Sequence, residues 1–122
     1  MDTLVQAANQ AQAFFDEYRN ALLARDAGRI ADSYHCPALI AFPGHVQAVT
    51  DPAQTRTFFE TAMRQYDGVT DASISITVLG FTAHSIWADV TWDYNEAASA
   101  ERSVYQLLAT KYGWRIGVLT PH

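Results

Sequence analysis

The chain has 122 residues, which suits one domain spanning residues 1–122, and 49% of them are hydrophobic, enough for one sizeable core. Eight basic residues against 13 acidic ones give a net charge of −5 without a basic stripe, which argues against nucleic-acid binding. No stretch approaches the roughly 18 consecutive apolar residues of a membrane span. The single cysteine, Cys36, excludes an intramolecular disulfide and fits a cytoplasmic location.

The first quarter of the chain predicts a long helix followed by a short one. Apolar residues recur there at three- and four-residue steps, as in a helix that buries one face, and they predict a first helix over residues 3–25. This apolar face consists of Leu4, Ala8, Ala11, Phe15, Tyr18 and Leu22. The short second helix follows Asp26. It is expected to end near His35, because the residue before Pro37 is disfavoured in helical conformation.

Two short strands and a third helix come next. Residues 38–42 and 46–49 are expected to be strands, because they are mainly apolar and a Pro-Gly turn signal separates them. Asp51 is followed by a proline, which the first turn of a helix tolerates, so Asp51 is the predicted N-cap of a third helix. That helix is expected to end near Gly68.

The second half of the chain predicts only strands. Apolar and polar residues alternate over residues 73–78 and 85–94. Residues 102–111 and 114–119 are expected to be the last two strands, with a turn at residues 95–99 before them. Helices followed by an antiparallel meander indicate an α+β fold, in which the helices pack on one face of a curved sheet.

Residues at both ends of this order resemble those of a known superfamily. The opening helices carry Phe15, Tyr18, Leu22 and Asp26, followed by Tyr34, and the chain closes with a hairpin from Tyr105 through Ile116. With the order of elements, these motifs resemble the nuclear transport factor two-like superfamily, which includes SnoaL-like proteins and ketosteroid isomerases. The resemblance covers nearly the whole chain. It implies a cystatin-like α+β barrel: a cone-shaped, strongly curved, mostly antiparallel sheet with three helices on its concave side.

Ketosteroid isomerase is the catalytic template that the resemblance offers. Tyr18 matches the place of its oxyanion-hole tyrosine, and Tyr34 matches a second pocket tyrosine. The general base, however, is replaced by Phe42, which cannot accept a proton. The second acidic donor falls at Leu107, or at Gln106 if the hairpin slips by one residue. The resemblance therefore supports the fold and argues against ketosteroid isomerisation.

Other members, similar to limonene-epoxide hydrolase or to SnoaL-like cyclases, need an acid inside the cone. The candidates are Asp89 and Asp93, on a strand whose apolar set is Ile86, Ala88, Val90, Trp92 and Tyr94. Burying that set places both aspartates on the opposite, convex face, and a one-residue register error would reverse this. The same alternation exposes Trp87, with Ser103, Tyr105 and Leu107 expected nearby. An exposed tryptophan favours a homodimer through the convex face.

The expected pocket is apolar. Its expected lining is Tyr18, Tyr34, Phe42, Phe59, Val90, Trp92 and Leu107. Tyr18 and Tyr34 are candidates to donate a hydrogen bond to a ligand or to act in acid–base catalysis, and a purely structural role for each hydroxyl is the alternative. His35 is a third catalytic candidate, and it could meet His45 at the pocket mouth. Two histidines do not make a metal site, so neither a metal nor another cofactor is expected.

These features together favour a SnoaL-like pocket protein that binds a small apolar molecule. Two alternatives stay open. The first is an isomerase, hydrolase, dehydratase or cyclase that uses tyrosine or histidine as acid and base. The second is a non-catalytic dimerising module whose cone is filled by its own side chains. A cavity of roughly 300 Å³ or more would favour ligand binding over the module.

Overall fold

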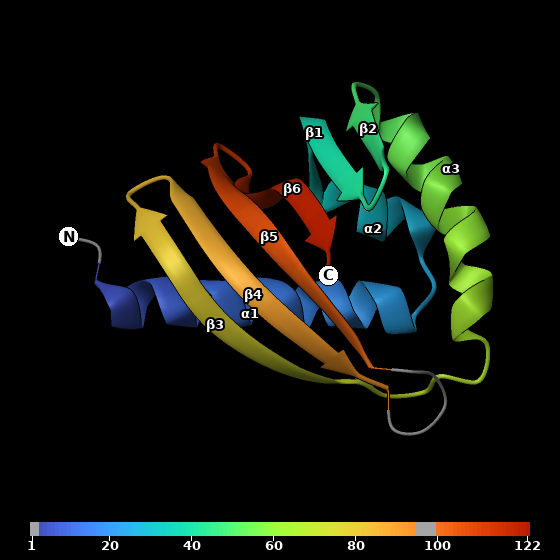
Figure 1. The fold of residues 1–122 in the computed structure, drawn as a ribbon, viewed down its shortest axis with the longest axis horizontal. Helices are drawn as coiled ribbons and strands as arrows, with labels where there is room; N and C mark the ends of the chain where they lie inside the picture. Colours follow the sequence, from blue (N-terminus) through green and yellow to red (C-terminus); the bar gives the residue numbers. More distant parts are fainter. Residues whose placement is uncertain (1–2, 95–99) are drawn as a thin grey trace.

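The computed structural model describes residues 3–94 and 100–122 of the chain (Figure 1). Its helices are α1 (Leu4–Leu23), α2 (Ala27–Asp32) and α3 (Pro52–Ala62), and a 3₁₀ turn, η1 (Met63–Tyr66), continues α3. The strands are β1 (Tyr34–Phe42), β2 (His45–Val49), β3 (Ser73–Thr82), β4 (Ser85–Asp93), β5 (Glu101–Thr110) and β6 (Gly113–Pro121). The turn predicted at residues 95–99 lies outside the described residues.

Local capping defines where the helices begin. The Thr3 hydroxyl accepts a hydrogen bond from the backbone N–H of Gln6, and the Gln6 side chain accepts one from the backbone N–H of Thr3. These two hydrogen bonds form a capping box at the start of α1. Asp51 and Gln54 form the same arrangement at α3, with Pro52 in the first turn, as the sequence indicates. Each box satisfies backbone donors that have no partner inside the helix.

The six strands form one sheet in the order β2-β1-β6-β5-β4-β3. Strands β3 to β6 make the predicted antiparallel meander, and among the described strands only the pairing of β1 with β6 is parallel. Figure 1 shows the sheet curving around α1, which lies across its concave face, with α3 beyond the β1–β2 hairpin. This is the predicted α+β cone, with the helices on the concave side. None of the described helices is both long and apolar enough to span a membrane.

The first strand begins four residues earlier than predicted, and α2 ends at Asp32 rather than near His35. The reason is a long-range pairing. Tyr34 pairs with Ile116 of β6, and the Ile116 amide donates to the carbonyl of Ser33 at 2.8 Å. The edge of β6 therefore draws the segment before Pro37 into the sheet.

Alternation along β4 determines what faces the helices. Its buried residues are Ile86, Ala88, Val90 and Trp92, so Asp89 and Asp93 point to the convex side, as predicted. The prediction for β5 was wrong: Ser103, Tyr105 and Leu107 are buried on the concave side, not near Trp87. Trp87 pairs with Gln106, and directly paired residues share a face of the sheet.

Aromatic side chains build the core on the concave face. Phe15 of α1 is fully buried and packs edge-on against the rings of Trp92 and Tyr105, with ring centroids 6.4 and 4.8 Å away. Tyr18, one turn further along α1, is 3% exposed. Of the apolar face predicted for the first helix, Ala11, Phe15 and Tyr18 are buried. The prediction was wrong at its start, where Leu4 and Ala8 are exposed and Ala7 is buried instead.

Candidate functional site

A cavity of about 550 Å³ lies where the concave side of the sheet meets α3 and the end of α1. Strands β4, β5 and β6 supply one wall, and α3 with η1 supplies the opposite wall. Eight aromatic side chains border it: Tyr18, Phe42, Phe58, Phe59, Tyr66, Trp92, Tyr94 and Tyr105. The volume falls within the range of small-molecule sites, roughly 300–1,000 Å³.

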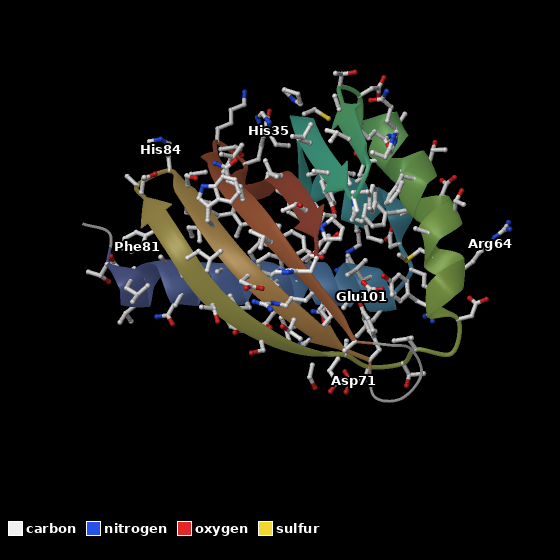
Figure 2. The ribbon with its side chains drawn as sticks, viewed as in Figure 1. His35, Arg64, Asp71, Phe81, His84 and Glu101 are labelled. Atoms are coloured by element: carbon white, nitrogen blue, oxygen red, sulfur yellow. The ribbon has the colours of Figure 1, made fainter. Side chains whose placement is uncertain are left out.

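Glu101 places a carboxylate among these rings. It is the first residue of β5 and pairs with Trp92, so it shares the concave face of the sheet. The Tyr66 hydroxyl shares its one proton between the two carboxylate oxygens, Oε1 at 2.8 Å and Oε2 at 2.9 Å, and the Tyr94 hydroxyl donates to Oε2 at 3.3 Å. Figure 2 labels Glu101 between the start of β5 and α3, whereas Arg64 projects away from the protein.

The two phenols that hold Glu101 are themselves fixed by neighbouring structure. The Arg25 guanidinium donates to the carbonyls of Tyr66 and Val69 at 2.6 and 2.9 Å, which positions η1. The rings of Tyr66 and Tyr94 lie 5.2 Å apart. Burial, followed by the proximity of Tyr66 and Glu101, raises the pKa of Tyr94 far above its usual range, so Tyr94 remains a hydrogen-bond donor at physiological pH.

Two basic residues that border the cavity, Arg102 and His122, have a partner on the convex side. Arg102 donates to Asp89 through Nε and Nη2 at 3.0 and 2.6 Å. His122 lies 3.7 Å from the same carboxylate. The hydrogen bonds from Arg102 lower the pKa of Asp89, because they stabilise its charged form. The positive charge of Arg102 is therefore directed to Asp89, away from the cavity.

Tyr18 and Tyr34 form a buried pair, with their hydroxyl oxygens 2.8 Å apart. Tyr18 borders the cavity, and Tyr34 lies behind it, packed against the ring of Phe59 at 5.6 Å. Burial raises the pKa of both phenols well above the usual value, so both stay protonated at neutral pH. One of the two hydroxyl protons forms the hydrogen bond between Tyr18 and Tyr34, and the other proton is available for a hydrogen bond to another acceptor.

The two histidines singled out from the sequence do not meet. His45 pairs with Phe42 at one end of β1, while His35 lies near the other end, seven residues or roughly 20 Å away. Nδ1 of His35 makes a local contact with the carbonyl of Pro37 at 2.8 Å. Neither histidine borders the cavity, so the expected meeting at its mouth is wrong: the length of β1 separates them.

The other predicted lining residues divide into two groups. Phe42, Phe59 and Trp92 border the cavity, whereas Val90 and Leu107 are fully buried in the core beside it. Sequence reasoning missed Tyr66 and Glu101. The alternation of β5 carried a usable signal, because Glu101 has the same parity as the large apolar residues at positions 105 and 107.

A second hollow of about 490 Å³ lies between α1, α2 and β6. Its lining includes charged residues of both signs, among them Glu17, Arg29, Asp32 and Arg115. Three aromatic residues border it, Phe14, Tyr18 and Trp114, so its aromatic enclosure is weaker than that of the first cavity. Within residues 3–94 and 100–122, no three His, Cys, Asp or Glu side chains gather as metal ligands.

Comparison with known proteins agrees with the fold. A family model described as "NTF2-like protein (DUF6841)" matches residues 8–122. An NTF2-like protein of unknown function from Shewanella baltica has a similar structure, with a TM-score of 0.74 at 13% identity over 100% of this chain and 97% of that one.

Two further solved structures share the fold. One, from Streptomyces avermitilis, is provisionally described as a dehydratase of the NTF2-like family; its TM-score is 0.70 at 11% identity over 98% of this chain and 97% of that one. The other, a cystatin-like domain of unknown function from Nostoc punctiforme, has a TM-score of 0.67 at 12% identity, covering 99% and 78% of the two chains. No significant match was found among curated proteins.

Proposed function

The chain belongs to the NTF2-like family DUF6841, and from its cavity we propose that it binds one small, mainly apolar or aromatic molecule. The observation that carries the proposal is the cavity of about 550 Å³, which the described residues wall with aromatic side chains around one carboxylate. Ligand sites of this kind combine apolar walls with a few fixed polar groups. A core filled by its own side chains would not retain such a volume, so the geometry favours the pocket over the module.

Stable placement of the walls supports binding with little rearrangement. Tyr18 is fixed by its bond to Tyr34, and Tyr66 and Tyr94 are fixed by Glu101. A ligand that enters such a site loses little affinity to the ordering of side chains.

Binding is tested by titrating the protein with 2-(2-naphthyl)ethanol, a neutral aromatic probe, and following backbone and indole N–H signals by NMR. We expect the indole N–H signal of Trp92 to shift at saturation, because Trp92 borders the cavity. The Ala62→Phe variant adds a ring at the cavity wall and should weaken binding at least tenfold. Ala109→Phe is the matched control, since Ala109 is exposed on β5 outside the cavity.

The proposal fails if the probe shifts no cavity signals, or if Ala62→Phe and Ala109→Phe bind it equally. Binding in the second hollow would instead shift the indole N–H of Trp114, which borders that hollow and not the first cavity.

Acid–base catalysis at Glu101 is a second candidate function. A carboxylate beside two phenol donors has the groups required for proton transfer to and from a bound molecule. The provisional dehydratase among the structural neighbours is consistent with such chemistry in this fold. In that case Glu101→Gln would abolish turnover while leaving the binding of a neutral ligand nearly unchanged.

A further inference from the structure

We propose that the natural ligand of this cavity is an organic amine whose positive charge lies against Glu101 and whose apolar body rests on the surrounding aromatic rings. The inference rests on the ligand-binding function proposed above and adds the chemical class of the ligand. It follows from the charge around Glu101, from its remaining hydrogen-bond capacity and from the rings beside it.

The charge of Glu101 has no protein counter-ion in the described part of the chain. Arg102 and His122, which border the same cavity, both face Asp89 on the convex side. Arg25, the cation behind Tyr66, donates to two backbone carbonyls. A glutamate held by neutral phenols beside apolar walls leaves a negative potential in the cavity, which attracts a cation and repels an anion.

The hydrogen-bond capacity of the carboxylate points the same way. An ionised carboxylate has about four acceptor positions on its two oxygens. The hydroxyls of Tyr66 and Tyr94 make three contacts with them, which leaves a position for a donor from the ligand. An ammonium group has three donors and no acceptor, so it suits a site made of acceptors.

Aromatic rings lie beside the carboxylate and suit a cation as well. The ring of Tyr94 lies 5.2 Å from that of Tyr66 and stacks on that of Trp92 at 6.4 Å, with an interplanar angle of 10°. A cation within about 6 Å of such a ring is attracted by its negative face. Further along the wall, Phe58 and Phe59 offer an uncharged surface for the rest of the ligand.

The test compares three probes that share one ring system: 2-(2-naphthyl)ethylamine, 2-(2-naphthyl)ethanol and 2-naphthylacetate. Their Kd values are measured by calorimetry at pH 7, and the Trp92 indole N–H signal locates the binding. We expect the amine to bind about tenfold more tightly than the alcohol, as for a hydrogen bond to a charged rather than a neutral group. The acetate should bind most weakly.

Glu101→Gln removes the charge but keeps a side chain of the same shape. It should reduce the preference for the amine over the alcohol to within twofold, while the Kd of the alcohol changes little. Glu60→Gln is the matched control: Glu60 is exposed on α3 beside Arg56, and its replacement changes the net charge equally. That variant should keep the full preference.

The outcomes distinguish failure of the amine inference from failure of ligand binding. Equal Kd values for amine and alcohol in the wild-type protein would overturn the amine inference while ligand binding stands. Failure of all three probes to bind would remove both. Tightest binding of the acetate, or equal loss of the preference in Glu60→Gln, would also overturn the inference. Should Glu101→Gln fail to fold, the wild-type ratio of the three Kd values decides the matter.

Discussion

Replacing Tyr18 by phenylalanine tests the buried hydroxyl pair directly. The change removes only the oxygen that lies 2.8 Å from the hydroxyl of Tyr34. Tyr34 is 6% exposed, so its hydroxyl would be left in the core without this partner. An unpaired buried polar group costs about 1–3 kcal/mol. At about 4 °C per kcal/mol for a domain of this size, the Tm should fall by roughly 4–12 °C.

A double-mutant cycle isolates the pair. Tyr34→Phe should cost a similar free energy of unfolding, and the double variant should cost less than the sum of the two, because no hydroxyl is then orphaned. Thermal unfolding followed by circular dichroism at one fixed protein concentration measures all four proteins. Tyr112→Phe is the control, since Tyr112 is 72% exposed and its change should stay within about 0.5 kcal/mol.

Two results would refute this reasoning. A Tyr18→Phe variant as stable as the wild type would mean that the pair contributes nothing. Strictly additive costs would mean that the two hydroxyls do not depend on each other. If the pair also serves a ligand, Tyr18→Phe should weaken probe binding by more than the Tyr112→Phe control does.

Three further predictions concern acid stability, assembly and activity. Arg102 lowers the pKa of Asp89 in the folded state. The stabilisation of the folded state by this pair is therefore present above the unfolded pKa of Asp89 and is lost as the pH falls through its folded pKa. Asp89→Asn should be less stable than wild type at pH 7, and urea unfolding should show the difference in unfolding free energy shrinking toward pH 2. We expect a homodimer through the convex face, because Trp87 and Leu79 are 38% and 58% exposed there. Sedimentation should give twice the 13.5 kDa mass of the chain for the wild type and the single mass for Trp87→Arg. A wild-type monomer at micromolar concentration would contradict this prediction. With Phe42 where the template has its base, turnover of a 5-ene-3-ketosteroid should stay near the buffer rate, since general-base catalysis alone is typically worth about 10²–10⁴-fold; a rate well above buffer would mean that another residue is the base.

Features determined by neighbouring residues were predictable from the sequence. The caps at Thr3 and Asp51 form as expected, because each involves residues within one helical turn. The inward face of β4 was predictable from alternation, because apolar and polar residues alternate without a break from residue 88 to residue 94. The turns at Gly44 and Gly113 have φ of 76° and 102°, where glycine avoids the strain of a side chain.

Features that depend on distant parts of the chain were not predictable. Strand β1 begins at Tyr34 only because β6, some 80 residues later, offers it a parallel edge. At the Glu101 site, Tyr66 and Tyr94 lie 35 and 7 positions from Glu101 in the sequence. Both tyrosines resemble ordinary core aromatic residues in the sequence, yet their hydroxyls are the hydrogen-bond donors of the site. The error over Ser103 and Tyr105 had a simpler cause: the parity of β5 was not compared with that of β4.

The central place of β6 has a consequence for the order of events during synthesis. The last strand in the sequence stands between β1 and β5, so the β1–β2 hairpin cannot join the meander until β6 has been made. Until then, the apolar faces of the helices have no complete sheet to cover them, and such surfaces are prone to aggregate or to recruit chaperones. A nascent chain stalled just before β6 should therefore be far more sensitive to protease than one released after it.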